Sequence, residues 1–284
     1  MPIRPDLLLA HAFPEARQRY TKRDAILYAL GVGLGGDPTD PADLSFLLED
    51  RLRTLPTFAV TLGSPGAWIK APQFGVDYAK LVHYEQSARF HAPLPPEAET
   101  VSRARVVCVA DRGAGRGAVV VIERDIRDAT LEVSYCTLRQ TLLLRGDGGF
   151  GGSPPPQVAS IIPEREPDAR AAFAIDPRAA LIYRLSGDWN PLHADPAAAK
   201  AGGFDRPILH GLASYAVAAV AVSRACGFSP DQVTAVRCRF TGVAFPGDTI
   251  DFRIWRESEG AVFQGFVGER KALDQGAVSF ANPT

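Results

Sequence analysis

The sequence feature that most constrains the fold is a diverged internal repeat. Three segments of the first copy match three of the second. Arg89-Phe90 followed by Pro96 matches Arg239-Phe240 followed by Pro246. ILYALG (26–31) matches LIYRLSG (181–187), and Asp40-Pro41 matches Asp195-Pro196. The first pair is 150 residues apart at every member, and the other two keep nearly the same offset. Chance rarely keeps such spacing, so the chain is interpreted as a duplication of one structural unit.

A glycine- and proline-rich stretch, GDGGFGGSPPP (146–156), divides the chain almost in half. Glycine and proline interrupt helices and strands, and 284 residues suit two domains of ordinary size. We therefore expect an N-terminal domain over 1–148, a linker over 149–156 and a C-terminal domain over 157–284. A long surface loop inside one domain is the alternative.

Each half is expected to hold one helix and a set of strands. The run LASYAVAAVAVSRA (212–225), followed by Gly227, predicts a buried helix. Alternating apolar residues predict strands near 234–240, 248–255 and 261–268 in the second half. In the first half, the same pattern predicts strands at 101–110 and 116–126, joined by the turn DRGAG (111–115). A helix wrapped by an antiparallel sheet is an α+β layout.

Composition excludes several functions. The net charge of −1 gives no basic patch for nucleic acid. Four cysteines without a C-x-x-C pair suggest free thiols in a reducing compartment. The longest apolar stretch, 212–222, is too short to cross a membrane, and the N-terminus shows no export signal. The last residues carry no peroxisomal signal, so we expect a cytoplasmic protein with no membrane partner.

The densest group of reactive side chains lies in one short segment of the second half. Asp188 offers an ionisable acceptor, and His193 titrates near neutrality, which together suit activation of a water molecule. Gly211, at the start of the expected helix, leaves backbone N–H groups open to a developing oxyanion. The plain alternatives are turn chemistry for the Asp and Asn, and close packing at a helix start for the Gly.

Two other motifs fail on their context. The glycines of 31–36 spell G-x-G-x-x-G, but they follow a helical segment and lead into no helix, so a dinucleotide cofactor is rejected. No third ligand stands at a recognisable spacing from Asp188 and His193, so no metal is expected. No cofactor is predicted.

The segment LSGDWNPLHADPAAAKAGGFDRPILHGLA (185–213) resembles the signature of the MaoC-like (R)-specific 2-enoyl-CoA hydratases, the hydratase 2 family. The resemblance extends over nearly the whole chain, through YALGVG, HYEQ, ADRGAG, GGFGG and RFTGVAFPGDT. It implies a tandem, or double, hot-dog fold with a long helix in each half and an acyl-CoA bound between the halves. It also implies reversible hydration of trans-2-enoyl-CoA to (R)-3-hydroxyacyl-CoA.

The same resemblance assigns roles to residues. Asp188 and His193 match the catalytic positions, Asn190 orients the pair, and Gly211 donates to the thioester carbonyl. Positions expected to touch the substrate are His83, Tyr84, Arg112, Trp189, Pro191, Leu192 and Phe240. Tyr84 stands where the family usually has glycine, so a side chain there narrows the expected site. The first half lacks the Asp and His and is expected to accommodate the acyl chain.

Two other functions share this fold and ligand. A hot-dog acyl-CoA thioesterase cleaves the thioester but needs no Asp-x-Asn-Pro-x-His element. A non-catalytic acyl-CoA-binding partner subunit needs no intact pair of Asp188 and His193. The sequence specifies neither the acyl chain length, nor the pathway, nor which of the two residues delivers the α proton, and it leaves a homodimer open.

Overall fold

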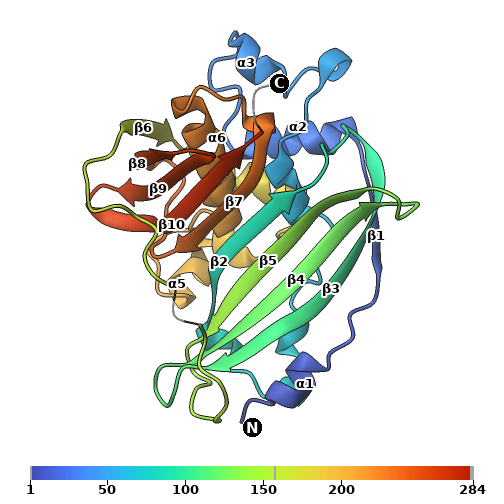
Figure 1. Ribbon diagram of the computed structural model, residues 1–284, viewed down its shortest axis with the longest axis vertical. Coiled ribbons are helices and arrows are strands. Elements are labelled where there is room, and N and C mark those ends of the chain that lie inside the picture. Colours follow the sequence, from blue (N-terminus) through green and yellow to red (C-terminus); the bar gives the residue numbers. More distant parts are fainter. Residues whose placement is uncertain (1, 157, 282–284) are drawn as a thin grey trace.

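One ten-stranded antiparallel sheet runs through both halves of the computed structural model, which describes residues 2–156 and 158–281 (Figure 1). The first half supplies β1 (Ala16–Tyr20), β2 (Leu81–Phe90), β3 (Ala98–Asp111), β4 (Ala118–Asp128) and β5 (Ser134–Leu144). The second half supplies β6 (Ala169–Ala174), β7 (Val233–Phe240), β8 (Thr249–Glu257), β9 (Gly260–Val267) and β10 (Arg270–Phe280). The strand order, β1-β3-β4-β5-β2-β7-β10-β9-β8-β6, has the same pattern on both sides of the β2–β7 seam.

The strands form where apolar and polar residues alternate. In β8, Ile250, Phe252 and Ile254 are buried, whereas Asp251 and Arg253 between them are exposed. This period of two places one row of side chains on the core and the other in solvent. All five strands expected from the sequence are confirmed, as is the turn between β3 and β4.

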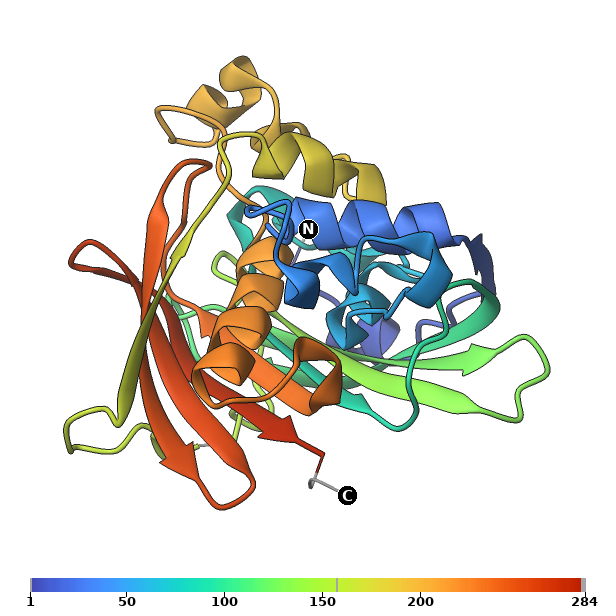
Figure 2. The same cartoon turned by 90° about the horizontal axis from the view of Figure 1, so that it is seen from above.

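The long helix of the second half is α6 (Gly211–Ala225), which the sheet of that half curves around (Figure 2). Its residues from Ala213 to Ser223 are buried on every face, as its alanine-rich, uncharged sequence requires. The helix ends before Gly227, whose φ of 86° no β-branched residue adopts readily. The predicted buried helix is therefore confirmed.

The first half departs from the expected long helix. Its segment from residue 52 to 80 holds only short 3-10 helices: η2 (Pro56–Thr61), η3 (Trp68–Lys70), η4 (Pro72–Phe74) and η5 (Tyr78–Lys80). Prolines begin two of these turns, and Gly63, Gly66 and Gly75 have positive φ, so no continuous helix can form. The tandem hot-dog fold stands, but the expectation of a long helix in each half is wrong for the first half.

The remaining helices show the duplication directly. In the first half, α2 (Lys22–Gly31) precedes α3 (Pro41–Leu44); in the second, α4 (Ala179–Tyr183) precedes α5 (Pro196–Ala201). Asp40 and Asp195 cap α3 and α5 in the same way, each accepting the N–H two residues on at 2.9 and 2.8 Å. The short elements α1 (Pro5–Leu9), η1 (Glu49–Arg51), η6 (Arg184–Ser186), η7 (Pro191–His193) and η8 (Pro230–Gln232) complete the set.

The two halves meet along helices as well as along the sheet. Helix α2 packs on α4 so closely that a Cβ at Gly31 would lie 3.0 Å from the Cα of Tyr183. Ion pairs also join the two halves, Glu85 with Arg239 at 3.2 Å and Arg53 with Asp231 at 2.7 Å. Because these pairs are partly exposed, each contributes at most about 1 kcal/mol, and apolar packing supplies most of the cohesion.

The glycine-rich segment after β5 is tied to the β3–β4 turn. The carboxylate of Asp111 accepts the N–H groups of Gly113, Gly149 and Gly151 at 2.7, 2.8 and 2.7 Å. These bonds hold the start of the expected linker; residue 157 and the last three residues lie outside the described structure. In the described parts, no helix is long and apolar enough to cross a membrane.

Candidate active site

Asp188 and Asn190 lie in an irregular loop between η6 and η7. Gly187, with φ of 115°, turns the chain into this loop. The Asn190 N–H donates to Asp188 Oδ1 at 3.2 Å, and the Asn190 side chain accepts the Leu192 N–H at 3.2 Å. Asn190 therefore begins the turn that carries His193 and holds the Asp188 carboxylate through its backbone. Asp188 itself is exposed to solvent.

His193 ends η7 and is buried. Its Nδ1 lies 2.9 Å from the carbonyl oxygen of Ile208. A carbonyl only accepts, so Nδ1 carries the proton and Nε2 presents a free lone pair. Burial lowers the pKa of His193, although the Ile208 carbonyl and the Asp188 charge oppose this, so the neutral ring, a base, is favoured.

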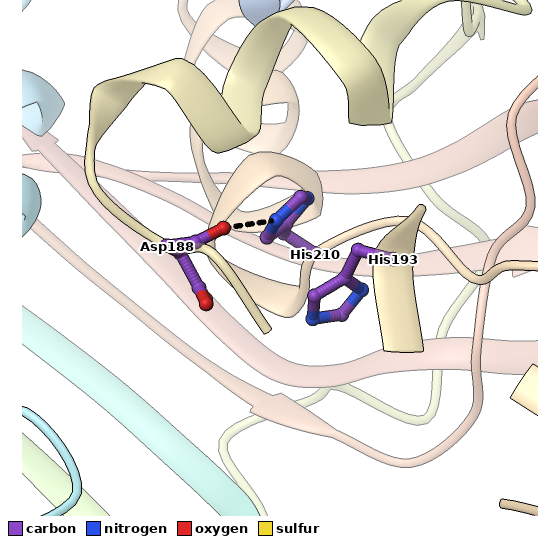
Figure 3. Close-up of side chains that lie close together, drawn as sticks. All are labelled: Asp188, His193 and His210. Carbon is purple, nitrogen blue, oxygen red and sulfur yellow. Dashed lines mark hydrogen bonds between the residues drawn. The ribbon is translucent and has the colours of Figure 1, made fainter. Parts of the chain in front are cut away.

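His210, which precedes α6, stacks on His193 with ring centroids 3.8 Å apart. Its Nε2 donates to the backbone carbonyl of Asp188 at 3.2 Å (Figure 3). Burial, and then the neighbouring His193, lower the pKa of His210, so this ring too is neutral. His210 thus positions both the Asp188 loop and the His193 ring.

The three side chains meet at one point. A carboxylate oxygen of Asp188 and one nitrogen from each of His193 and His210 all lie within 4.8 Å of one another. Two groups at that separation can each make a hydrogen bond of about 2.8 Å to one water molecule between them. Figure 3 shows the Asp188 carboxylate and the His193 ring on either side of the same space.

The N-terminus of α6 borders this space. Gly211 is its first residue, and the first N–H groups of any helix lack acceptors within it. A Cβ at Gly211 would lie 3.5 Å from the ring of Phe240, which is ordinary contact. Phe240 in turn meets His83 edge to face, with centroids 5.0 Å apart. Gly211, Phe240 and His83 are therefore neighbours, as a site shared by both halves requires.

His83 and Tyr84 reach this region from β2 of the first half. Burial lowers the pKa of His83 to about 4, while the charge of Asp188 opposes the shift, which places these two groups within electrostatic reach. Tyr84 is the unpaired residue of a β-bulge between His83 and Glu85, and its ring lies 4.9 Å from the Arg239 guanidinium. The Tyr84 side chain is thus held by a cation–π contact.

The other residues assigned to substrate binding are less central. Trp189 is 55% exposed and stacks under the Arg184 guanidinium at 4.6 Å, beside Asp188. Pro191 is exposed at the start of η7, whereas the end of the Leu192 side chain lies against Gly202. Arg112 lies in the β3–β4 turn, where its backbone N–H donates to the carbonyl oxygen of Gly117 at 3.0 Å. The substrate contacts of these four residues remain predictions.

His210 is the residue that sequence reasoning missed. It had no assigned role, although its position directly before Gly211 and the expected helix was an available signal. It also places a third side chain of a metal-ligating type beside Asp188 and His193, which their spacing in the sequence did not reveal. However, the His193 and His210 rings are stacked 27° from parallel, an arrangement unlike that of ligands converging on one ion. The expectation of no metal stays a prediction.

Comparison with known proteins gives consistent matches for both halves. Residues 18–146 match the model of the MFE-2 hydratase 2 N-terminal domain, and residues 158–276 match that of the MaoC like domain. The peroxisomal enoyl-CoA hydratase 2 of Arabidopsis thaliana is 38% identical over 93% of this chain and 91% of its own. The 3-hydroxyacyl-thioester dehydratase Y of Mycobacterium tuberculosis is 40% identical over 92% and 93%.

Solved structures agree. A MaoC-like dehydratase from Phytophthora capsici superimposes with a TM-score of 0.85 at 30% identity, covering 99% of this chain and 100% of that one. Fold and site together define an enzyme of the hot-dog hydratase/dehydratase class. Within it, the chain belongs to the MaoC-like hydratase 2 family, which confirms the resemblance seen in its sequence.

Proposed function

We propose that the protein catalyses the reversible hydration of trans-2-enoyl-CoA to (R)-3-hydroxyacyl-CoA. The observation that carries this proposal is the convergence of the Asp188 carboxylate and the His193 ring beside the N-terminus of α6. The names of the two relatives support it, since an enoyl-CoA hydratase and a 3-hydroxyacyl-thioester dehydratase describe one reaction in its two directions.

The proposed chemistry follows from the geometry. A water molecule held between Asp188 and the free Nε2 of His193 loses a proton to this pair as its oxygen bonds to C3 of the enoyl group. The π electrons of the double bond move toward the thioester, and the oxygen of the resulting enolate accepts the Gly211 N–H. A proton then returns from the pair to the α carbon, so no net proton is gained or lost.

Each part has a familiar magnitude. A positioned acid or base contributes about 10² to 10⁴ in rate, and one oxyanion donor about 10² to 10³. The positive end of the α6 dipole adds to the stabilisation of the enolate. His210 and Asn190 act as positioning residues, because they hold the reacting groups without touching the substrate in this scheme.

The stereochemistry follows from the placement of the catalytic pair. Asp188 and His193 come from one loop, so both meet the planar enoyl group from one face. The hydroxyl and the hydrogen are then added to the same face, and the family resemblance specifies the 3R product.

The first half is proposed to accommodate the acyl chain and to take no part in the chemistry. Where α6 fills the second half, the first half has only the six-residue η2. This proposal predicts turnover of long enoyl-CoAs, and a strict limit to four-carbon substrates would contradict it.

Coupled oxidation tests the proposed function. The product formed from trans-2-enoyl-CoA should be oxidised by an (R)-3-hydroxyacyl-CoA dehydrogenase and should be inert with the (S)-specific enzyme. Oxidation by the (S)-specific enzyme alone would overturn both the stereochemical argument and the assignment of one catalytic face.

A further inference from the structure

Arg124 in β4 points into the interior of the first half. Its neighbours Glu123 and Asp125 bind arginines on the outer face of the sheet, Glu123 at 2.8 Å from Arg139 and Asp125 at 2.6 Å from Arg127. Because side chains alternate along a strand, Arg124 belongs to the opposite face. That face also carries the fully buried Ile122 and Ile126, which belong to the core.

The guanidinium of Arg124 is only partly satisfied by the protein. Its Nη2 donates to the carbonyl oxygen of Val60 in η2 at 2.7 Å, which confirms the inward direction. A guanidinium has five N–H donors, and no carboxylate of residues 2–156 or 158–281 forms an ion pair with this one. The side chain also keeps some accessible surface, so the remaining donors are not sealed within the core.

An inward cation without a counter-charge is costly. Burial lowers the pKa of Arg124 to about 10, which still leaves it charged at neutral pH. Withdrawing a charge from water without a counter-charge costs free energy that an apolar residue of similar size would not, so packing alone does not account for an arginine here. A missing anionic partner that enters with the substrate does account for it.

Arg124 lies farther into the first half than the residues that border the reaction site. On β5, His83 pairs with Leu142 and Arg124 with Leu138, four residues apart, which is about 13 Å along a strand. The Arg124 charge nonetheless contributes to the lowered pKa of His83, so the two groups belong to one interior region. Gln140, whose Nε2 lies 3.5 Å from His83 Nδ1, stands between those two levels of β5.

We propose that Arg124 recognises a carboxylate at the far end of the acyl chain, so that ω-carboxy-2-enoyl-CoAs are preferred substrates. This inference rests on the proposed function and on an acyl chain that enters the first half past His83. Arginine suits the task because its planar fork binds a carboxylate through two parallel hydrogen bonds. The alternative is a purely structural guanidinium that ties β4 to η2 through Val60.

The test compares kcat/KM for matched pairs of trans-2-enoyl-CoAs, with and without a terminal carboxylate, over a series of chain lengths. We expect the wild-type enzyme to prefer the carboxylated member by at least about tenfold at one length, the effect of a charge-assisted hydrogen bond. Arg124→Met should abolish this preference while plain substrates turn over at or above the wild-type rate. Arg124→Lys should retain part of it.

Arg139→Met is the matched control, since it removes an arginine from the outer face of the neighbouring strand and should leave the preference unchanged. If wild-type enzyme shows no preference at any length, or Arg124→Met keeps it, the proposal is overturned while hydration itself stands. If no enoyl-CoA of either kind is hydrated by the wild type, the proposed function fails and this inference fails with it.

Discussion

Residues 28–41 and 183–196 are two copies of one segment that differ in their reactive side chains. Both begin with a buried tyrosine, Tyr28 or Tyr183, and both end in an Asp-Pro pair that caps a helix. Between these ends the copies have equal length, but the positions of Asp188, Asn190 and His193 are occupied in the first copy by Gly33, Gly35 and Pro38.

The difference lies in what each copy contacts. Leu34 is 3% exposed, whereas Trp189 at the matching position is 55% exposed. Gly33 has φ of 92°, and a Cβ there would lie 2.8 Å from the ring of Phe173. The first copy therefore packs Gly31 to Leu34 into the protein, whereas the second exposes Asp188 and Trp189 to solvent. Duplication preserved the backbone frame, and only one copy carries reactive groups.

The largest effect is expected from removing either member of the catalytic pair. Asp188→Asn and His193→Ala should each lower kcat for hydration by about 10² to 10⁴, because each removes a proton-handling group. Steady-state rates with crotonyl-CoA, together with circular dichroism to check the fold, measure this. Pro38→Ala, at the position that matches His193, is the control and should keep full activity. Near-wild-type turnover in either site variant would refute the site assignment.

Gly211→Val should cost nearly as much, about 10² to 10³ in kcat, by displacing the thioester oxygen from the helix N-terminus. Gly211→Ala is the control: its Cβ meets Phe240 at ordinary contact distance, so its loss should be much smaller. A valine variant with full turnover would show that another group holds the oxyanion.

Much of this comparison was visible in the sequence. Alternation predicted the strands, one apolar run predicted α6, and the Asp-x-Asn-Pro-x-His spacing predicted the reactive pair. The role of His210 was hidden because it depends on two long-range contacts, with the Asp188 carbonyl and the His193 ring. The inward direction of Arg124 was hidden because consecutive residues near the end of β4 are charged, so the sequence does not show which face of the strand is buried there.

Placing the aspartate of the second copy at Gly33 tests whether the backbone of the first copy excludes a side chain there. Gly33→Asp should leave hydration unchanged and should destabilise the protein by about 1 to 3 kcal/mol, because an L side chain is strained at this φ and collides with Phe173. Thermal unfolding measures the loss, and Gly36→Asp, at a glycine without positive φ or close neighbours, is the control. Unchanged stability in Gly33→Asp would show that the loop yields easily.

A further effect concerns acid stability. The folded-state pKa of His83 is about 4, below the value of about 6.5 in the unfolded chain, so the unfolded state binds more protons between these values. Stability should therefore fall as pH is lowered from about 6.5 toward 4. His83→Gln, which cannot be protonated, should show a shallower fall in denaturant unfolding over the same range. An identical pH dependence in both proteins would refute the buried, neutral His83.

The central claim is that the second-half loop adds water to an enoyl-CoA rather than cleaving its thioester. The direct measurement follows loss of the conjugated enoyl-thioester absorbance and release of free thiol, side by side, in one reaction of the wild-type protein with trans-2-enoyl-CoA. We predict that the absorbance falls to an equilibrium value with no thiol released, and that Asp188→Asn nearly stops the fall. Stoichiometric release of thiol would contradict the account and identify a thioesterase.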